Sequence, residues 1–219
     1  ATLANDLVQL TATAVVTDAD GDTATDSDTI DLGGNINFAD DGPSVTVAAT
    51  EDNDVDLTTL DAESLTSTST DVSSAADFTS MFTVTPVAGA DRNATTVTTY
   101  SLSLATAAGV AVVNGTYSGL DAGNDSSAPS NIYLHDIGGV VYGSTVETGT
   151  DTDVINDAVF TIAVAPTTGI VTLTQISEIQ HANDAASSNY DAQLATLAND
   201  LVQLTATAVV TDADGDTAT

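Results

Sequence analysis

The chain carries the same 25 residues at both ends, and this repeat constrains its fold more than any other feature. Residues Ala1–Thr25 read ATLANDLVQLTATAVVTDADGDTAT and return without a mismatch at Ala195–Thr219, a period of 194 residues. Long periods repeated with full identity are typical of tandem arrays in much larger proteins. We therefore expect this chain to come from the middle of a long, repetitive polypeptide.

Each copy has the pattern of a β-hairpin. Apolar and polar residues alternate on both sides of Asp18–Asp22, and Asp-Gly between two alternating runs is a strong hairpin signal. Similar runs predict further strands, with hairpins joining 131–134 to 140–142 and 159–164 to 169–174. The other strands are expected at 44–49, 82–85, 96–104 and 110–117. Short strands about ten residues apart, separated by turn residues, predict an all-β fold built as an antiparallel β-sandwich.

A joint between two structural units is expected at Asp40-Asp41-Gly42-Pro43, because Pro43 blocks regular strand pairing and Asp-Asp-Gly favours a turn. Residues 1–42 are then the C-terminal hairpin and joint of a preceding repeat. A segment of about 40 residues scarcely folds alone, so it should dock on the body or on a neighbouring molecule. Residues 43–219 form the main repeat unit, lacking its last strand, as one sandwich or as two divided near 77–96.

The charge balance is extreme, with 32 Asp and Glu against one basic residue, Arg92, for a formal net charge of −31. Such a chain repels itself unless cations bind or screen it, which indicates surroundings rich in calcium or salt. A generic acidic, well-solvated surface is the alternative. Nucleic acids and anionic membranes are excluded as partners because both require Lys and Arg. The absence of Cys rules out disulfides and suits a secreted bacterial protein.

Clustered Asp residues at turns make Ca²⁺ the expected cofactor, since calcium takes six to eight oxygen ligands. Asp18, Asp20 and Asp22 stand at i, i+2 and i+4 on one tight loop, and close like charges repel unless a cation lies between them. The spacing differs from that of an EF-hand, and a solvated hairpin tip is the alternative. The candidate metal ligands are Asp18, Asp20, Asp22, Asp40, Asp41, Glu51, Asp52, Asp212, Asp214 and Asp216.

The sequence argues against an enzyme and against a small-molecule substrate. His135 and His181 lie far apart, neither fits an HExxH spacing, and there is no Gly-x-Ser-x-Gly motif. Alternating threonines, at Thr11–Thr13, Thr83–Thr85 and Thr172–Thr174, leave a second hypothesis open, in which a Thr-rich β face binds carbohydrate or ice. Threonine also favours strands in general, and its outward face is usually just solvated.

Several segments resemble the tandem repeats of giant bacterial RTX adhesins. They are Leu204–Thr219 and its N-terminal copy, the joint Phe38–Val45, and Val159–Ile162 with Thr168–Gln175. The resemblance covers most of residues 131–219 and 1–49, and residues 50–130 match less clearly. The nonapeptide Gly-Gly-x-Gly-x-Asp is missing, so the chain is not the C-terminal β-roll of such a protein.

In that family such repeats are extender modules. They are immunoglobulin-like β-sandwiches that bind Ca²⁺, become rigid and hold ligand-binding domains away from the cell. The parent proteins leave by type I secretion and stay anchored in the outer membrane. The resemblance thus implies an extracellular spacer for cell adhesion and biofilm formation, with identical neighbouring repeats as its partners. It also places metal ligands at Asp40 and Asp41 and at Asp18, Asp20 and Asp22.

Overall fold

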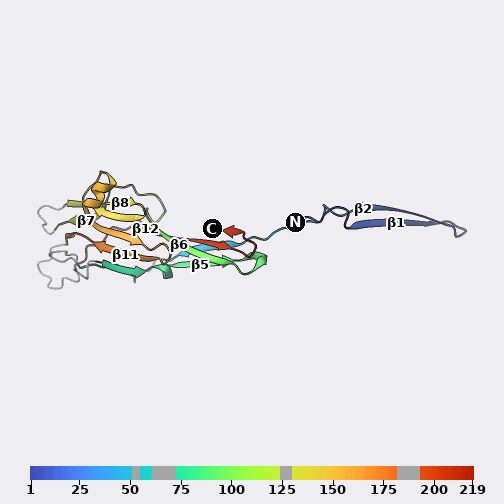
Figure 1. Cartoon of the computed structure of the whole chain (residues 1–219), viewed down its shortest axis with the longest axis horizontal. Helices are drawn as coiled ribbons and strands as arrows, with labels where there is room; N and C mark the ends of the chain where they lie inside the picture. Colours follow the sequence, from blue (N-terminus) through green and yellow to red (C-terminus); the bar gives the residue numbers. More distant parts are fainter. Residues whose placement is uncertain (51–54, 61–72, 124–129, 182–192) are drawn as a thin grey trace.

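A computed structural model describes residues 1–50, 55–60, 73–123, 130–181 and 193–219. The molecule is elongated: a body of packed sheets occupies one end, and a long two-stranded hairpin extends from it along the molecular axis (Figure 1). The expected all-β fold with antiparallel sheets packed as sandwiches is confirmed. No helix in the described ranges is long and apolar enough to cross a membrane.

The largest sheet of the body has six antiparallel strands in the order β4-β11-β10-β9-β8-β7. The strands are β4 (Ser73–Asp77), β7 (Thr116–Ala122), β8 (Ser130–Ile137), β9 (Val140–Ser144), β10 (Ala158–Val164) and β11 (Ile170–Gln175). The two predicted hairpins inside it, β8-β9 and β10-β11, are confirmed. In both, two apolar runs flank a short turn, so chain neighbours also become sheet neighbours.

Two long strands form a layer opposite the six-stranded sheet, and the same strands also contact a smaller two-stranded sheet. Strands β6 (Thr95–Leu104) and β12 (Val202–Thr211) pair over ten residues, and β13 (Thr217–Ala218) pairs with the outer edge of β12. Strands β3 (Ser44–Ala49) and β5 (Phe82–Val87) pair with each other and lie against β12. The long strands therefore contact the six-stranded sheet at one end and the β3-β5 pair at the other.

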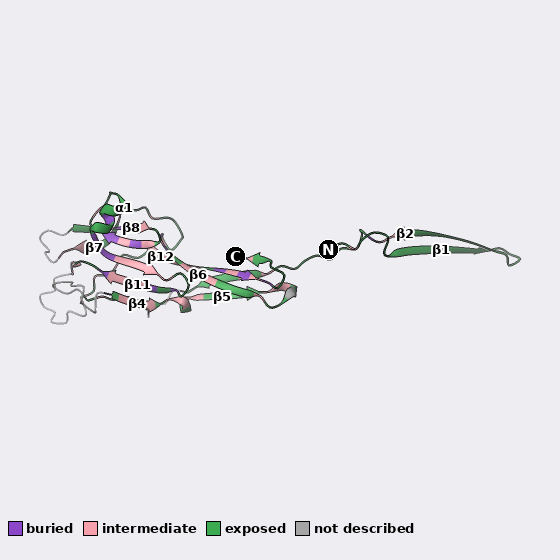
Figure 2. Ribbon diagram, viewed as in Figure 1, coloured by how far each residue is buried: buried purple, intermediate pink, exposed green. Residues whose placement is uncertain are grey.

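The main core lies where β6 meets the six-stranded sheet. Its buried residues are Leu102, Leu104, Leu120, Ile132, Leu134, Val141, Val159 and Phe160. Farther along β12, Ala208 and Val210 are 2% and 0% exposed. Burial of such side chains stabilises the body by about 25 cal/mol for each Å² of apolar surface removed from water. Figure 2 shows that the buried residues gather in the body.

Within the described ranges, three short helices connect the strands, and the sequence predicted none of them. They are η1 (Thr79–Met81), η2 (Gly89–Asp91) and α1 (Asp151–Asn156). Helix α1 begins with a capping box, in which Thr150 Oγ1 accepts from the Asp153 N–H and the Asp153 carboxylate accepts from the Thr150 N–H. The Thr150 hydroxyl and N–H lower the pKa of Asp153 by hydrogen bonding to its carboxylate.

The strand predicted at 110–117 is wrong, and the true strand, β7, begins at Thr116. The chain turns at Gly115, whose φ of +88° favours glycine and where the Glu147 carbonyl leaves no room for a Cβ. Val110 and Val113, which supplied the strand signal, lie outside any strand and are 62% and 74% exposed. A short apolar run therefore gave a false strand signal here.

The N-terminal hairpin consists of β1 (Gln9–Thr17) and β2 (Thr23–Asp31), paired from Gln9↔Asp31 to Thr17↔Thr23. Hydrogen bonds from the N–H groups of Asp6 and Gly33 to the Asp31 carboxylate close its base. These two bonds lower the pKa of Asp31. Strand β1 is exposed along its whole length, and β2 is exposed except at its half-buried last residue (Figure 2). Docking of residues 1–42 on the body or on a neighbouring molecule stays a prediction.

Candidate metal centre

The tip of the C-terminal hairpin presents two carboxylates to solvent on a tight loop. Asp212 Oδ1 accepts hydrogen bonds from the N–H groups of Gly215, at 3.1 Å, and Asp216, at 2.8 Å. Gly215 has φ = +104°, a conformation in which a side chain would be strained. The folded loop leaves the side chains of Asp214 and Asp216 on the outside, where both are exposed.

The joint before the body brings a third carboxylate to this tip. Ligand oxygens of Asp40, Asp214 and Asp216 all lie within 4.8 Å of one another, although about 175 residues separate Asp40 from the other two. We call these three residues the joint cluster. Asp40 precedes the body, and Asp214 and Asp216 lie just before its last strand, β13. The joint cluster therefore links the segment that leads into the body to the tip of the C-terminal hairpin.

Contacts with the β5-β6 connection hold the joint in place. The carbonyl oxygens of Asp41 and Gly42 lie against Gly89, at a distance that leaves no room for a Cβ there, and Gly89 has φ = +66°. Immediately after the joint, β3 pairs with β5 from Ser44↔Val87 onward, and β13 lies beside β3. Backbone packing therefore positions Asp40 next to the hairpin tip, and no disulfide is involved because the sequence has no Cys.

The joint cluster fits a calcium ion. Ca²⁺–oxygen distances are 2.3–2.6 Å, so two oxygens on one ion lie at most about 5 Å apart, which the 4.8 Å limit satisfies. Three carboxylates this close repel one another without a cation. A further oxygen on the same loop has no hydrogen-bond partner among the described residues: Asp212 is only 6% exposed, and its Oδ2 is buried. Buried polar atoms are normally paired, so this carboxylate also favours a cation near the tip.

The N-terminal copy has a cluster of its own, formed by Asp18, Asp20 and Asp22 and called here the tip cluster. Its ligand oxygens also lie within 4.8 Å of one another, and all three residues are exposed. Hydrogen bonding with the Asp20 side chain is the main cause that lowers the pKa of Asp18; desolvation opposes it, and N–H groups of the loop lower the pKa further. The tip cluster draws its carboxylates from one hairpin, whereas the joint cluster draws on two distant segments.

The structure therefore places six of the ten predicted ligands in two clusters. Asp41 and Asp212 belong to neither, and Glu51 and Asp52 lie outside the described residues. Sequence reasoning grouped Asp40 with Asp41, and Asp214 with Asp216, but did not join the two groups. Each local motif gave a signal, whereas the contact between them depends on the pairing of β3 with β5.

His135, one of the two histidines, has a structural role. It is 5% exposed, and its Nε2–H donates to the Val146 carbonyl at 2.8 Å. This bond holds the segment that follows β9 against β8. Nε2 of His135 is therefore engaged in this hydrogen bond within the protein and does not face solvent.

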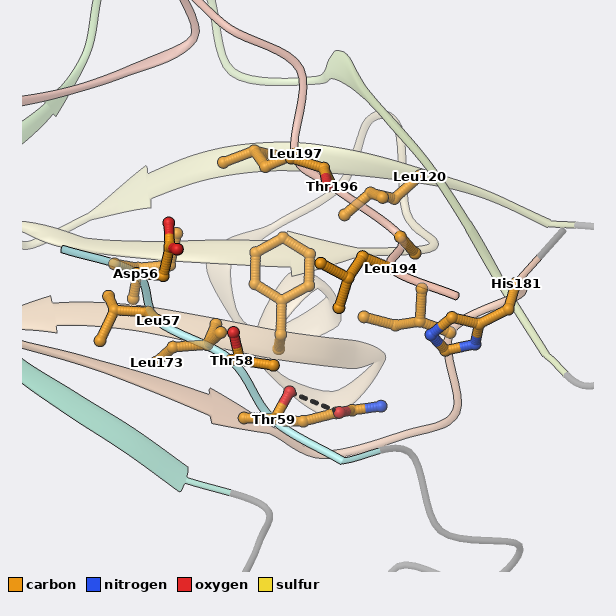
Figure 3. Close-up of a pocket in the computed structure, with 15 residues that line it drawn as sticks. Asp56, Leu57, Thr58, Thr59, Leu120, Leu173, His181, Leu194, Thr196 and Leu197 are labelled. Atoms are coloured by element: carbon orange, nitrogen blue, oxygen red, sulfur yellow. Dashed lines mark hydrogen bonds between the residues drawn. The ribbon is translucent and has the colours of Figure 1, made fainter. Parts of the chain in front are cut away.

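An apolar cavity of about 340 Å³ lies beside the six-stranded sheet (Figure 3). Leu120, Leu173, Leu194 and Leu197 line it, and His181 lies at one end. Thr59 Oγ1 donates to Gln175 Oε1 at 2.7 Å on one wall. The segments that line it lead into 61–72 and 182–192, which are outside the described ranges, so the cavity supports no ligand assignment.

Comparisons with known proteins bear on the body of the chain. Neither the curated proteins nor the solved structures gave a match. One family model matches residues 44–219, beginning at the first residue of β3. The match covers most of the chain, and the chain belongs to the family described as Domain of unknown function (DUF5801).

Proposed function

We propose that this chain is a structural extender repeat of a bacterial cell-surface adhesin, rigidified by Ca²⁺. The observation that carries the proposal is the joint cluster, because it brings together carboxylates from the segment that enters the body and from the hairpin tip. A cation bound there would couple the position of the body to that of the preceding hairpin. Metal binding would thus be linked to the order of an array.

Two further features support a spacer role. The exact repeat of 194 residues is typical of an array in which each added copy increases reach. The hairpin that precedes the body extends along the long axis of the molecule, so successive bodies would follow one another in line (Figure 1). The expected partners are identical neighbouring repeats, and the expected location is the exterior of the cell.

The strong negative charge gives calcium a clear physical task. With a formal net charge of −31, the folded chain repels itself at low ionic strength, and the joint cluster concentrates three of these charges. A divalent cation at this point would remove the local repulsion. Outside the cell, calcium is available at the millimolar levels for which extracellular modules are tuned.

Thermal melting of the full chain in excess chelator and in millimolar Ca²⁺ tests the proposal. We expect a higher melting temperature with calcium, and an Asp40→Asn variant should lose most of that increase because it removes the ligand from the joint. Asp28→Asn, on the exposed strand β2, is the matched control and should keep the full increase. Coincident melts of the wild-type chain with and without calcium would contradict the proposal.

A ligand-binding module is the second candidate, and one face of the β1-β2 hairpin favours it. Facing residues on this side carry hydroxyl groups, and the Oγ1 atoms of Thr11 and Thr29 are 3.0 Å apart. The hydroxyl residues of this face are Thr11, Thr13, Thr17, Thr23, Thr25, Ser27 and Thr29. Thr83 and Thr85 are also exposed, whereas Thr172 and Thr174 are half-buried. A carbohydrate-array screen and an ice-recrystallisation assay would detect such binding, which a spacer does not require.

A further inference from the structure

We propose that the β1-β2 hairpin is a docking element for the body of a second copy of this chain, where β1 takes the place of the partner's β12 and pairs with its β6 in the same register. Only the identity of the natural partner, the neighbouring repeat, rests on the proposed function. The docking itself follows from strand pairing and apolar burial. It requires neither calcium nor adhesion.

One face of the hairpin carries its large apolar side chains, and none of the described residues covers it. Even-numbered residues of β1 and β2 lie on one side, where Leu10, Val16 and Ile30 are 56%, 68% and 58% exposed. Asp26 and Asp28 lie on the same side near the middle of β2, opposite Ala14 and Ala12. The opposite face carries the hydroxyl residues described above. A two-stranded hairpin with one apolar face is marginally stable in water until that face is covered.

The structure itself shows how this sequence docks. Strand β12 repeats the sequence of β1 with an offset of 194 residues and pairs with β6 from Val202↔Leu104 to Thr211↔Thr95. Its even-numbered residues turn inward, and Ala208 and Val210, the equivalents of Ala14 and Val16, are almost fully buried. An identical strand has the same complementarity to β6, so β1 fits the β6 edge of another body.

In place of β12 and β13, the hairpin would also bring a longer second strand. Strand β13 pairs with β12 only at Val210↔Ala218 and Thr211↔Thr217, so β12 from 203 to 209 has no partner on that side within the described ranges. In the N-terminal copy, β2 continues the same register as far as Gln9↔Asp31. A docked hairpin therefore covers the β6 edge with β1 and supplies the full-length strand beside it.

The repeat itself supplies the experiment, because the same substitution can be made in either copy of the full chain. Val210→Asp places a charge at a fully buried position and should release β12 from its own β6. The freed β6 can then take the β1-β2 hairpin of another molecule. Such contacts are head-to-tail and do not close, so we expect a mixture of dimers and longer oligomers. Size-exclusion chromatography with light scattering measures the mass.

Matched variants control for unfolding and unspecific association. Val16→Asp, at the exposed equivalent position, should stay monomeric and melt within about 2 °C of the wild type. The double variant with Val16→Asp and Val210→Asp should stay monomeric, because neither copy can dock. The melting temperature of its body should be lower than that of the Val210→Asp variant, because in the single variant a hairpin from another molecule replaces the lost contacts with β6.

Three outcomes would overturn the inference. One is a Val210→Asp chain that matches the double variant in both mass and melting temperature. Another is equal oligomerisation of the double variant, which would mean unspecific association. The last is a Val210→Asp chain that is monomeric but melts above the double variant, since the hairpin would then dock on its own body. The masses and melting temperatures of these variants can also be compared in excess chelator. Failure of the docking inference would appear there, whereas failure of the calcium proposal would appear only in the melts with calcium.

A disulfide tests the register. The chain has no cysteine, and Ala208 faces Thr98 in the β12-β6 pair, so Ala14 should face Thr98 of the second copy. In the Val210→Asp background, Ala14→Cys together with Thr98→Cys should give a ladder of intermolecular disulfides on a non-reducing gel. Replacing Ala14→Cys by Thr11→Cys moves the thiol three residues along the strand and should weaken the ladder at least tenfold.

Discussion

The two copies of the 25-residue repeat have one sequence and two environments. In the C-terminal copy, Val210 is fully buried against the body, whereas its N-terminal equivalent, Val16, is 68% exposed. Strand β12 lies between β6 and β13, but β1 pairs with β2 alone. The difference teaches that the repeat specifies a hairpin, while the burial of that hairpin depends on whether a complementary β6 edge lies beside it.

Local geometry is similar in the two copies, although the Gly21 N–H donates to the Asp18 carbonyl and the Gly215 N–H to the Asp212 carboxylate. The tip bond from the Asp22 N–H to Asp18 Oδ1 measures 2.9 Å, and the equivalent bond in the C-terminal copy measures 2.8 Å. The tip glycines Gly21 and Gly215 have φ values of +100° and +104°. The strand register next to the tip also agrees, Val16↔Ala24 in one copy and Val210↔Ala218 in the other. Turn chemistry thus fixes the hairpin independently of its surroundings.

The largest expected difference between the copies is in amide hydrogen exchange. We expect amides of Thr205–Val210 to exchange at least about 10³-fold more slowly than those of Thr11–Val16, because the former open only with the body and the latter with a marginal hairpin. The copies give peptides of equal mass, so resolved NMR signals are needed. Equal protection in dilute solution would show that β1 is covered after all.

Calcium binding should also distinguish the copies. Calcium at 100 times its dissociation constant adds about 2.7 kcal/mol to the free energy of unfolding. We expect Asp214→Asn to remove most of the calcium-dependent rise in melting temperature, because Asp214 belongs to the joint cluster. Asp20→Asn changes the equivalent residue in the tip cluster and should leave that rise in place. Equal losses would assign the effect to both hairpin tips.

A cavity substitution should show the same asymmetry. Val210→Ala removes two buried methyl groups and should lower the free energy of unfolding of the body by about 2 kcal/mol. Val16→Ala changes an exposed position and should alter it by less than about 0.5 kcal/mol. Urea denaturation of both variants measures the difference. A matching loss at both positions would mean that both copies are buried in solution.

The smallest expected effect is at the tip glycines. Both have positive φ, and nothing lies within 4 Å of a Cβ built on either, so alanine meets backbone strain and no clash. Gly215→Ala should destabilise the body by about 1 kcal/mol, and Gly21→Ala should leave its melting temperature unchanged. Differential scanning calorimetry can resolve shifts of this size. A fall in melting temperature with Gly21→Ala would indicate that the N-terminal hairpin contributes to the cooperative unit.

Much of the fold followed from local patterns. Alternation and turn residues predicted the hairpins β1-β2, β8-β9 and β10-β11, in which pairing partners are neighbours along the chain. Helix α1 escaped prediction because it is short and relies on the capping box of Thr150 and Asp153. The pairing of β6 with β12 also escaped it, since about a hundred residues separate the two strands and alternation does not name a partner.

The candidate site divides in the same way. The sequence pointed to Asp18, Asp20 and Asp22 as one cluster, because a tight turn brings carboxylates at i, i+2 and i+4 together. It also singled out Asp40, Asp214 and Asp216, but in separate motifs. Their convergence depends on the packing of the joint against Gly89 and on the long-range β3-β5 pair.

By itself, the sequence determined the all-β class, the hairpin at each end, the acidic tips and the array-like repeat. These depend on strand periodicity, turn chemistry and composition, all of which act over a few residues. Only the tertiary structure decided which copy is buried and which carboxylates meet. Those outcomes depend on the β6 edge and on the joint, whose contacts join residues far apart in the chain. Identical residues therefore have different roles at the two ends of this protein.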